Sequence, residues 1–186
     1  KENIYTHKEY NLYKKIFKSF SEYEKKRSRL IAQKVILKRI NGNIKIPTLQ
    51  TKENSFKKIR KNINSKVLID SNKFKVLISP HSFADAPHVR GNFFFADFYE
   101  WLIFLFKISS QTNYEWYIKL HPNYIVYFDD TYNVIKNLIK KYKTIKWIDP
   151  NISIKQLSDE GINAVLTVHG SIGSEFPILK IPVINA

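Results

Sequence analysis

The sequence contains no cysteine, which excludes disulfide bonds and zinc sites built on thiolates. Without thiols, cysteine usage gives no indication of the redox compartment. The sequence also lacks a signal-peptide pattern and a long hydrophobic run. Its most apolar stretch, residues 93–108, carries three charged side chains and is too short to span a bilayer. We therefore expect a soluble cytoplasmic protein, and the abundance of Lys, Asn and Ile is typical of a bacterium with an AT-rich genome.

Acidic residues are scarce only in the first part of the chain. Residues 1–75 contain 21 Lys/Arg and 6 Asp/Glu, whereas residues 76–186 contain 10 of each, so the net charge of +15 belongs to the N-terminal segment. Such a segment could contact anionic lipid headgroups at the inner face of the cell membrane, a polyanionic acceptor or nucleic acid. It could equally be a solvated helix surface.

The first 73 residues are predicted to form a basic helical segment followed by a linker. Aromatic and aliphatic residues recur at helix spacing over residues 8–40, and the Asn-Gly-Asn at residues 41–43 is a typical stop signal. Residues 44–73 combine a short apolar run with a basic stretch. Because the chain begins with Lys1 rather than Met, we interpret it as a piece of a longer protein.

Residues 74–186 alternate between apolar strand-like runs and helical patterns. The expected strands lie at residues 76–78, 116–120, 145–148, 164–168 and 181–184. The expected helices lie at residues 94–108, 129–142, 153–158 and 171–179. This alternation predicts an α/β fold with a Rossmann-like parallel sheet covered by helices on both faces. The chain ends directly after the last strand, so we interpret this domain as truncated at its C-terminus.

Short polar segments follow three of the expected strands. They are residues 80–88, residues 120–123 (Leu-His-Pro-Asn) and residues 169–175 (His-Gly-Ser-Ile-Gly-Ser-Glu). In a parallel sheet all three would open at the carboxyl ends of the strands, where ligands bind. A shared ligand site is therefore predicted at this edge.

The glycine- and serine-rich segment is the sharpest of the three. Its glycines let the backbone approach an anion, and the hydroxyls of Ser171 and Ser174 suit a phosphate, while Glu175 could accept hydrogen bonds from a ribose. An ordinary strand-to-helix turn is the simpler interpretation. Pro177 predicts that the following helix starts near Ser174 rather than Ser171, because proline is tolerated in a first turn.

Histidines and a carboxylate supply the candidates for proton transfer. His121 could donate to a phosphate oxygen or act as an acid on a leaving group. His81, Asp85 and His88 could supply a base, an acceptor site or metal ligands. A metal is not favoured, because no helical His-Glu-x-x-His spacing exists. The simpler interpretation of this loop is a connection stiffened by two prolines.

These segments resemble the C-terminal domain of GT-B glycosyltransferases, especially bacterial capsule polysaccharide biosynthesis proteins. The likeness covers residues 74–186, and it implies that residues 1–73 are the tail of an incomplete N-terminal domain. It rests on residues 119–122 (Lys-Leu-His-Pro), 149–150 (Asp-Pro), 170–175 and 181–184 (Ile-Pro-Val-Ile). The resemblance implies a metal-independent transferase without a cofactor. Its substrate would be a nucleotide-activated sugar, and its acceptor a glycan or a lipid-linked glycan.

The resemblance also assigns roles to single residues. The donor-binding residues that it implies are His121, Gly170, Ser171 and Glu175, and we add the neighbouring His169 and Ser174 to these candidates. The catalytic candidates are His121 at the leaving phosphate and Asp85, His81 and His88 as bases. Two positions depart from the family pattern: Pro177 replaces a small helix-forming residue, and His169 replaces a small polar one.

Other functions are compatible with the same pattern. Polyol-phosphate transferases and sugar-nucleotide 2-epimerases resemble it too, and a fold alone does not decide between them. The epimerases carry a carboxylate-rich turn where this chain has residues 174–176 (Ser-Glu-Phe), which disfavours that alternative. A basic module that binds polyanions is a non-enzymatic alternative. No recognised nucleic-acid motif supports it, and we expect no nucleic-acid partner.

Overall fold

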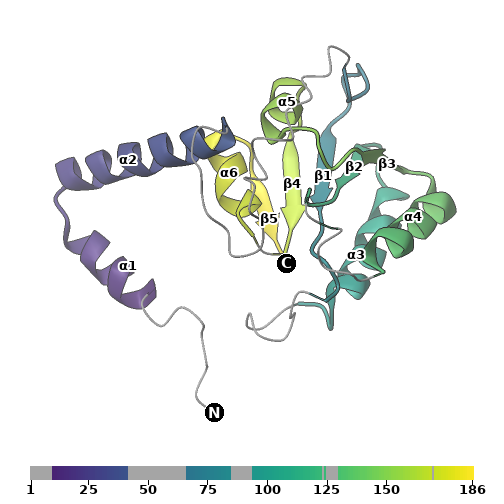
Figure 1. Ribbon diagram of the computed structural model, residues 1–186, viewed down its shortest axis with the longest axis horizontal. Coiled ribbons are helices and arrows are strands. Elements are labelled where there is room, and N and C mark those ends of the chain that lie inside the picture. Colours follow the sequence, from purple (N-terminus) through teal and green to yellow (C-terminus); the bar gives the residue numbers. More distant parts are fainter. Residues whose placement is uncertain (1–9, 42–65, 85–93, 123, 125–129, 169) are drawn as a thin grey trace.

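The structure is a computed structural model that describes residues 10–41, 66–84, 94–122, 124, 130–168 and 170–186. Two helices precede a regular alternation of strands and helices (Figure 1). The elements are α1 (Tyr10–Ser19), α2 (Glu22–Ile40), β1 (Lys75–Ser79), α3 (Phe98–Ser109), β2 (Glu115–Lys119), α4 (Thr131–Tyr142), β3 (Ile145–Ile148), α5 (Ile154–Asp159), β4 (Ala164–Thr167), α6 (Ile172–Ile178) and β5 (Val183–Asn185).

The five strands form one parallel sheet in the order β3-β2-β1-β4-β5. At the centre, Leu77 of β1 lies opposite Tyr117 of β2 on one side and Val165 of β4 on the other. An all-parallel sheet requires helical crossovers, and these cover both of its faces. The predicted Rossmann-like α/β fold is therefore confirmed.

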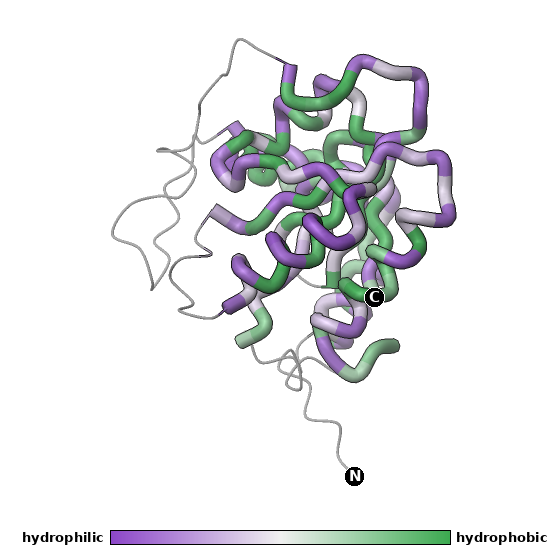
Figure 2. Tube along the Cα trace, turned by 90° about the vertical axis from the view of Figure 1, so that its right-hand side faces the viewer, coloured by the Kyte–Doolittle hydropathy of each residue, from purple (hydrophilic) through white to green (hydrophobic). Residues whose placement is uncertain are grey.

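Two hydrophobic clusters hold the layers together, one on each face of the sheet. Side chains alternate along a strand, so Val76 and Ile78 pack with α3 and α4, while Leu77 packs with α5 and α6. Along the surface helices, hydrophilic and hydrophobic residues alternate, as Figure 2 shows. Both faces are thus buried, which explains why the strands read as continuous apolar runs in the sequence.

The segment expected to be helical over residues 8–40 is helical in its described part, but it is divided into two helices. The break falls at residues 20–21, where Ser21 begins a capping box. Ser21 Oγ accepts a hydrogen bond from the Glu24 backbone N–H at 3.3 Å, and Glu24 Oε2 accepts from the Ser21 N–H at 2.8 Å. This reciprocal pair starts a new helix.

Caps also explain the later start of α3. Asp97 accepts a hydrogen bond from the Glu100 backbone N–H at 2.7 Å, so α3 begins at Phe98 and not at residue 94. Helix α4 begins at Thr131 rather than at the expected residue 129, although the side chain of its N-cap residue Asp130 makes no capping hydrogen bond. Ser153 caps α5 and accepts a hydrogen bond from the Gln156 backbone N–H at 3.1 Å.

The expected start of α6 near Ser174 is also wrong, because α6 begins at Ile172. Pro177 lies in its last turn, where the helix is already ending. Lys180 has a positive φ of 63°, and the Ile181 N–H donates to the Phe176 carbonyl at 3.1 Å. This is a Schellman end, which satisfies the terminal carbonyls directly after the proline.

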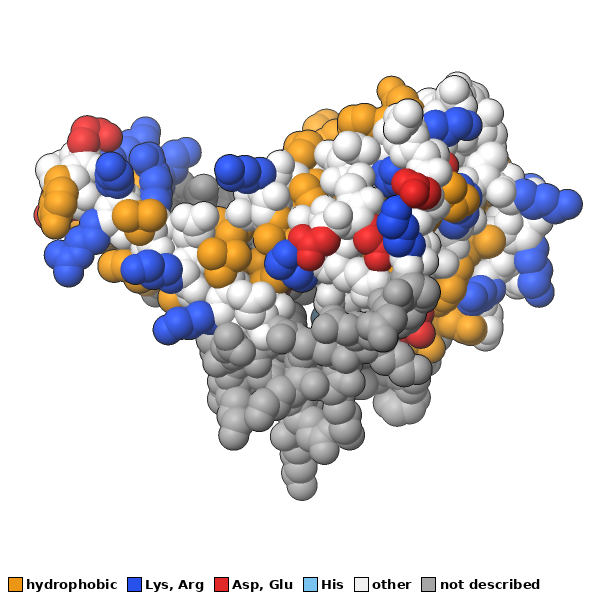
Figure 3. All heavy atoms as spheres, turned by 90° about the horizontal axis from the view of Figure 1, so that it is seen from above, with side chains coloured by type: hydrophobic (Ala, Val, Ile, Leu, Met, Phe, Trp, Pro, Cys, Tyr) orange, Lys and Arg blue, Asp and Glu red, His pale blue; other side chains and the backbone are white. Residues whose placement is uncertain are grey.

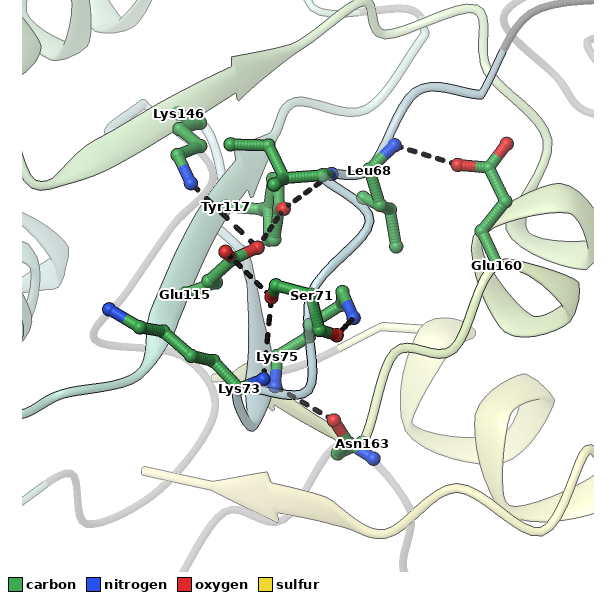
Figure 4. A network of polar contacts seen from close by, with 10 residues as sticks. Leu68, Ser71, Lys73, Lys75, Glu115, Tyr117, Lys146, Glu160 and Asn163 are labelled. Atoms are coloured by element: carbon green, nitrogen blue, oxygen red, sulfur yellow. Dashed lines mark hydrogen bonds and ion pairs between the residues drawn. The ribbon is translucent and has the colours of Figure 1, made fainter.

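Residues 66–73 fall within the expected linker, and the structure fastens them to the amino edge of the sheet (Figure 4). Glu160 accepts hydrogen bonds from the backbone N–H groups of Val67 and Leu68 at 2.8 and 2.7 Å. Ser71 donates to Glu115 at 2.8 Å. Burial opposes the charge of Glu115, but hydrogen bonds from Tyr117 and Ser71 hold the pKa of its carboxyl below the ordinary value.

No helix in the described part of the chain is both long and apolar enough to cross a membrane.

Candidate functional site

The ends of β1 and β4 lie side by side at the carboxyl edge of the sheet. Ser79 pairs with Thr167, and Thr167 Oγ1 donates a hydrogen bond to the Ser79 carbonyl at 3.0 Å. Beyond this pair, the chain after β1 leads to α3 on one face, and the chain after β4 leads to α6 on the other. Such a divergence is the topological switch point at which open α/β sheets bind ligands.

His81 and Gly170 meet at this switch point. A Cβ atom placed on Gly170 would lie 3.4 Å from His81 Nε2, so the imidazole rests directly against the glycine. Gly170 has a φ of 109°, a backbone conformation that residues other than glycine rarely adopt. The structure therefore brings together a predicted base candidate and a predicted phosphate-binding glycine.

The loop after β1 is held in place from two directions. The His81 ring lies 5.5 Å from the ring of Phe98, the first residue of α3. The backbone N–H of Phe83 donates to Thr131 Oγ1 at 2.9 Å, and Thr131 is the buried first residue of α4. Because both anchors are helix starts at this edge, the position of His81 is set by the layer of helices on that face.

The serines after Gly170 are available to a ligand. Ser171 is the N-cap residue of α6, yet its hydroxyl makes no capping hydrogen bond, unlike that of Ser153 at the start of α5. Ser174 is exposed in the first turn of α6. The two predicted phosphate-binding hydroxyls thus lie within one helical turn beyond the switch point.

Glu175 has a partner that its sequence context does not reveal. Its side chain is only 6% exposed, and its Oε1 lies 3.0 Å from Nε of Arg39 in α2. The predicted ribose contact of Glu175 stays a prediction. The structure shows instead a carboxylate turned toward Arg39, where it joins the N-terminal helices to α6.

Lys119 is the ionisable residue at this edge that the analysis of the sequence missed. It is the last residue of β2 and only 5% exposed, and its Nζ is 3.4 Å from the Leu120 carbonyl oxygen. Burial lowers the pKa of Lys119 to about 8, although the charges of Asp149 and Glu175 act in the opposite direction. A lysine at the end of a strand, two residues before His121 and in an otherwise apolar run, was the available signal.

The other predicted residues divide into two groups. His121 follows β2 at the same edge and is exposed, and its carbonyl accepts a hydrogen bond from the Tyr124 N–H at 3.0 Å. Three predicted residues lie outside the described part of the chain: Asp85, His88 and His169.

The site as described combines groups that suit an anionic ligand. An imidazole, a glycine without a side chain and two hydroxyls surround the switch point, and a buried ammonium group lies at the end of the adjacent strand. Within the described ranges, no group of three or more His, Asp or Glu side chains is arranged to hold a metal ion.

The chain matches no protein-family model. Comparisons with curated proteins and with solved structures found no significant match.

We predict that Gly170→Ala and Gly161→Ala have the same effect on stability and different effects on His81. Both glycines have positive φ, of 109° and 95°, so each alanine should lower the free energy of unfolding by about 1–2 kcal/mol. Only the methyl at residue 170 would touch His81, because nothing lies within 4 Å of a Cβ at Gly161.

Urea unfolding measures the first effect, and the NMR signals of the His81 ring measure the second. Gly170→Ala should shift the ring signals, and Gly161→Ala should leave them in place. Equal shifts in the two variants, or none in Gly170→Ala, would contradict the described contact.

We predict that Lys119→Met stabilises the protein at neutral pH. The folded-state pKa of about 8 lies below the ordinary 10.5, so the folded state disfavours the charged form. The free-energy cost of burying the charged ammonium group is fully present below pH 8, and it disappears as the pH rises toward 10.5. The variant should therefore gain about 1–3 kcal/mol in free energy of unfolding at pH 7.

The gain in free energy of unfolding of Lys119→Met should shrink between pH 8 and 10.5, as measured by urea unfolding across that range. Lys107→Met, at an exposed position of α3, is the control and should change stability by less than about 0.5 kcal/mol. A gain in Lys119→Met that does not vary with pH would show that the ammonium group carries no such penalty.

Proposed function

We propose that the protein is a glycosyltransferase that binds a nucleotide-activated sugar at the switch point between β1 and β4. The contact of His81 with Gly170 carries this proposal. It unites the loops of two neighbouring strands at the position where Rossmann-like sheets bind nucleotides. The resemblance of the segments after β2 and β4 to GT-B donor domains supports the same ligand class.

The phosphates of the donor would lie against Gly170, with the Ser171 and Ser174 hydroxyls as hydrogen-bond donors. The absence of a side chain at Gly170 permits close approach of the backbone, and the Ser171 hydroxyl is not engaged in capping α6. His81 Nε2 borders the same space and would donate a hydrogen bond to a phosphate oxygen when protonated. This assignment makes His81 a phosphate contact rather than a base.

Transfer would be a displacement at the anomeric carbon of the sugar. An acceptor hydroxyl oxygen forms the new bond, the bond from the anomeric carbon to the phosphate oxygen breaks, and the leaving nucleotide keeps the electron pair. A base removes the hydroxyl proton, and Asp85 and His88 are the candidates for it. Hydrogen-bond donors at the phosphate stabilise the charge that develops there, which is the role we assign to His81 and His121.

The proposal predicts selective nucleotide binding, which titration calorimetry with CMP, CDP, UDP and GDP measures. One of the four should bind, and His81→Ala and Ser171→Ala should each weaken that binding by about tenfold or more. Ser158→Ala is the matched control. It lies in α5, directly before the loop to β4, and so at the opposite edge of the sheet.

Failure of all four nucleotides to bind a folded sample would contradict the donor site. If one binds, incubation with the corresponding sugar nucleotide and analysis of the products separates transfer of a sugar from transfer of a polyol phosphate and from epimerisation.

A further inference from the structure

We propose that α1 and the exposed part of α2 form a docking surface for an anionic lipid membrane. This surface is called the arm below, and it comprises residues 10–35. The arm extends away from the sheet in Figure 1, and Figure 3 shows its Lys and Arg side chains beside hydrophobic ones. The proposal does not depend on the nucleotide site.

The side chains of α1 are segregated onto two opposite faces. Leu12, Tyr13 and Ile16 share one face by their i, i+3 and i, i+4 spacing, and they are 55%, 59% and 43% exposed. The opposite face carries Lys14, Lys15 and Lys18. An apolar face with a lysine-rich polar face is the pattern of a helix that lies in the plane of a membrane interface.

The exposed part of α2 also carries both apolar and basic side chains, but they are intermixed around the helix rather than segregated onto two faces. Leu30, Ile31 and Val35 are exposed among basic residues. Over residues 10–41 the chain carries ten Lys/Arg and two Glu. The guanidinium of Arg29 lies 5.5 Å above the ring of Phe17, which connects α2 to α1 and lets the two helices act together.

The apolar component selects lipid among the anionic partners. Binding to nucleic acid or to an anionic polymer uses the positive charge and aromatic stacking, and it offers nothing to exposed leucine and isoleucine side chains. An anionic membrane offers partners to both kinds of side chain. Its headgroups attract the lysines, and the boundary between headgroups and acyl chains buries the aliphatic side chains. A second copy of the chain would place basic arms against each other, which their charge opposes.

The arm is attached to the sheet domain next to the candidate site. Arg39, near the end of α2, pairs with the buried Glu175 of α6, and Ile40 is buried. A membrane bound by the arm would therefore be held in a defined position relative to α6.

Co-sedimentation of the full chain with lipid vesicles tests the proposal. Vesicles of phosphatidylcholine mixed with phosphatidylglycerol should bind the protein about tenfold or more tightly than phosphatidylcholine alone. The triple change Lys14→Gln, Lys15→Gln, Lys18→Gln should weaken binding to the mixed vesicles by about tenfold or more. The matched control removes three exposed lysines elsewhere: Lys107→Gln, Lys140→Gln, Lys141→Gln.

The apolar contribution is tested by Leu12→Ser with Ile16→Ser, which keeps every charge. This variant should bind mixed vesicles about tenfold or more weakly, and circular dichroism checks that it keeps its helices. Equal losses in the two triple lysine variants would show attraction by net charge alone and overturn the proposal.

Three further results would also overturn it: no binding to mixed vesicles, binding unaffected by the serine changes, and a dimer in sedimentation velocity that the serine changes abolish. The second result would point to a soluble polyanion. The third would mean that a second copy covers the arm.

Discussion

The position of β1 between β2 and β4 is the constraint on which the rest of this structure depends. The chain builds β1, β2 and β3 outward on one side and must then return across β1 to place β4. Helices α3 and α4 consequently cover one face, and α5 and α6 cover the other. The loops after β1 and β4 must leave the sheet in opposite directions, which brings His81 against Gly170 at the point of divergence.

Buried charge at the carboxyl edge is the second determinant of the site. Lys119 and Glu175 are buried and Arg39 is half-buried, and a buried charge is destabilising unless groups of opposite charge compensate it. Glu175 pairs with Arg39 and acts electrostatically on Lys119, so the edge, α6 and the N-terminal arm are linked through one carboxylate. Natural sequences tolerate such costs chiefly at functional sites, and this edge is where the topology places a ligand.

The order and type of the elements in the sheet domain could be predicted from the sequence, because a sheet buried on both faces produces apolar runs. Helix boundaries were less predictable, since they depend on single capping residues. Ser21 divides a helical region that apolar periodicity leaves continuous, and Asp97 starts α3 later than periodicity places it. The Schellman end after Pro177 allows α6 to begin at Ile172.

The site was predictable only in part. Polar segments after strands predicted that the loop of His81 and the turn at Gly170 lie at the same edge of the sheet, and the structure brings them together there. The partner of Glu175 could not be predicted, because Arg39 belongs to a helix at the other end of the chain. Lys119 resembled an ordinary strand-end lysine until the packing of the face with α5 and α6 showed its burial.

The most direct test of the account is to map a nucleotide onto the protein by NMR. Uniformly labelled protein is titrated with the nucleotide that binds most tightly, and backbone amide and histidine ring shifts are followed. The account predicts that the largest changes occur at Ser79–Ala84 and Gly170–Ser174. Changes concentrated at the amino edge, around Glu115 and Glu160, or on the arm would contradict a ligand site at the switch point.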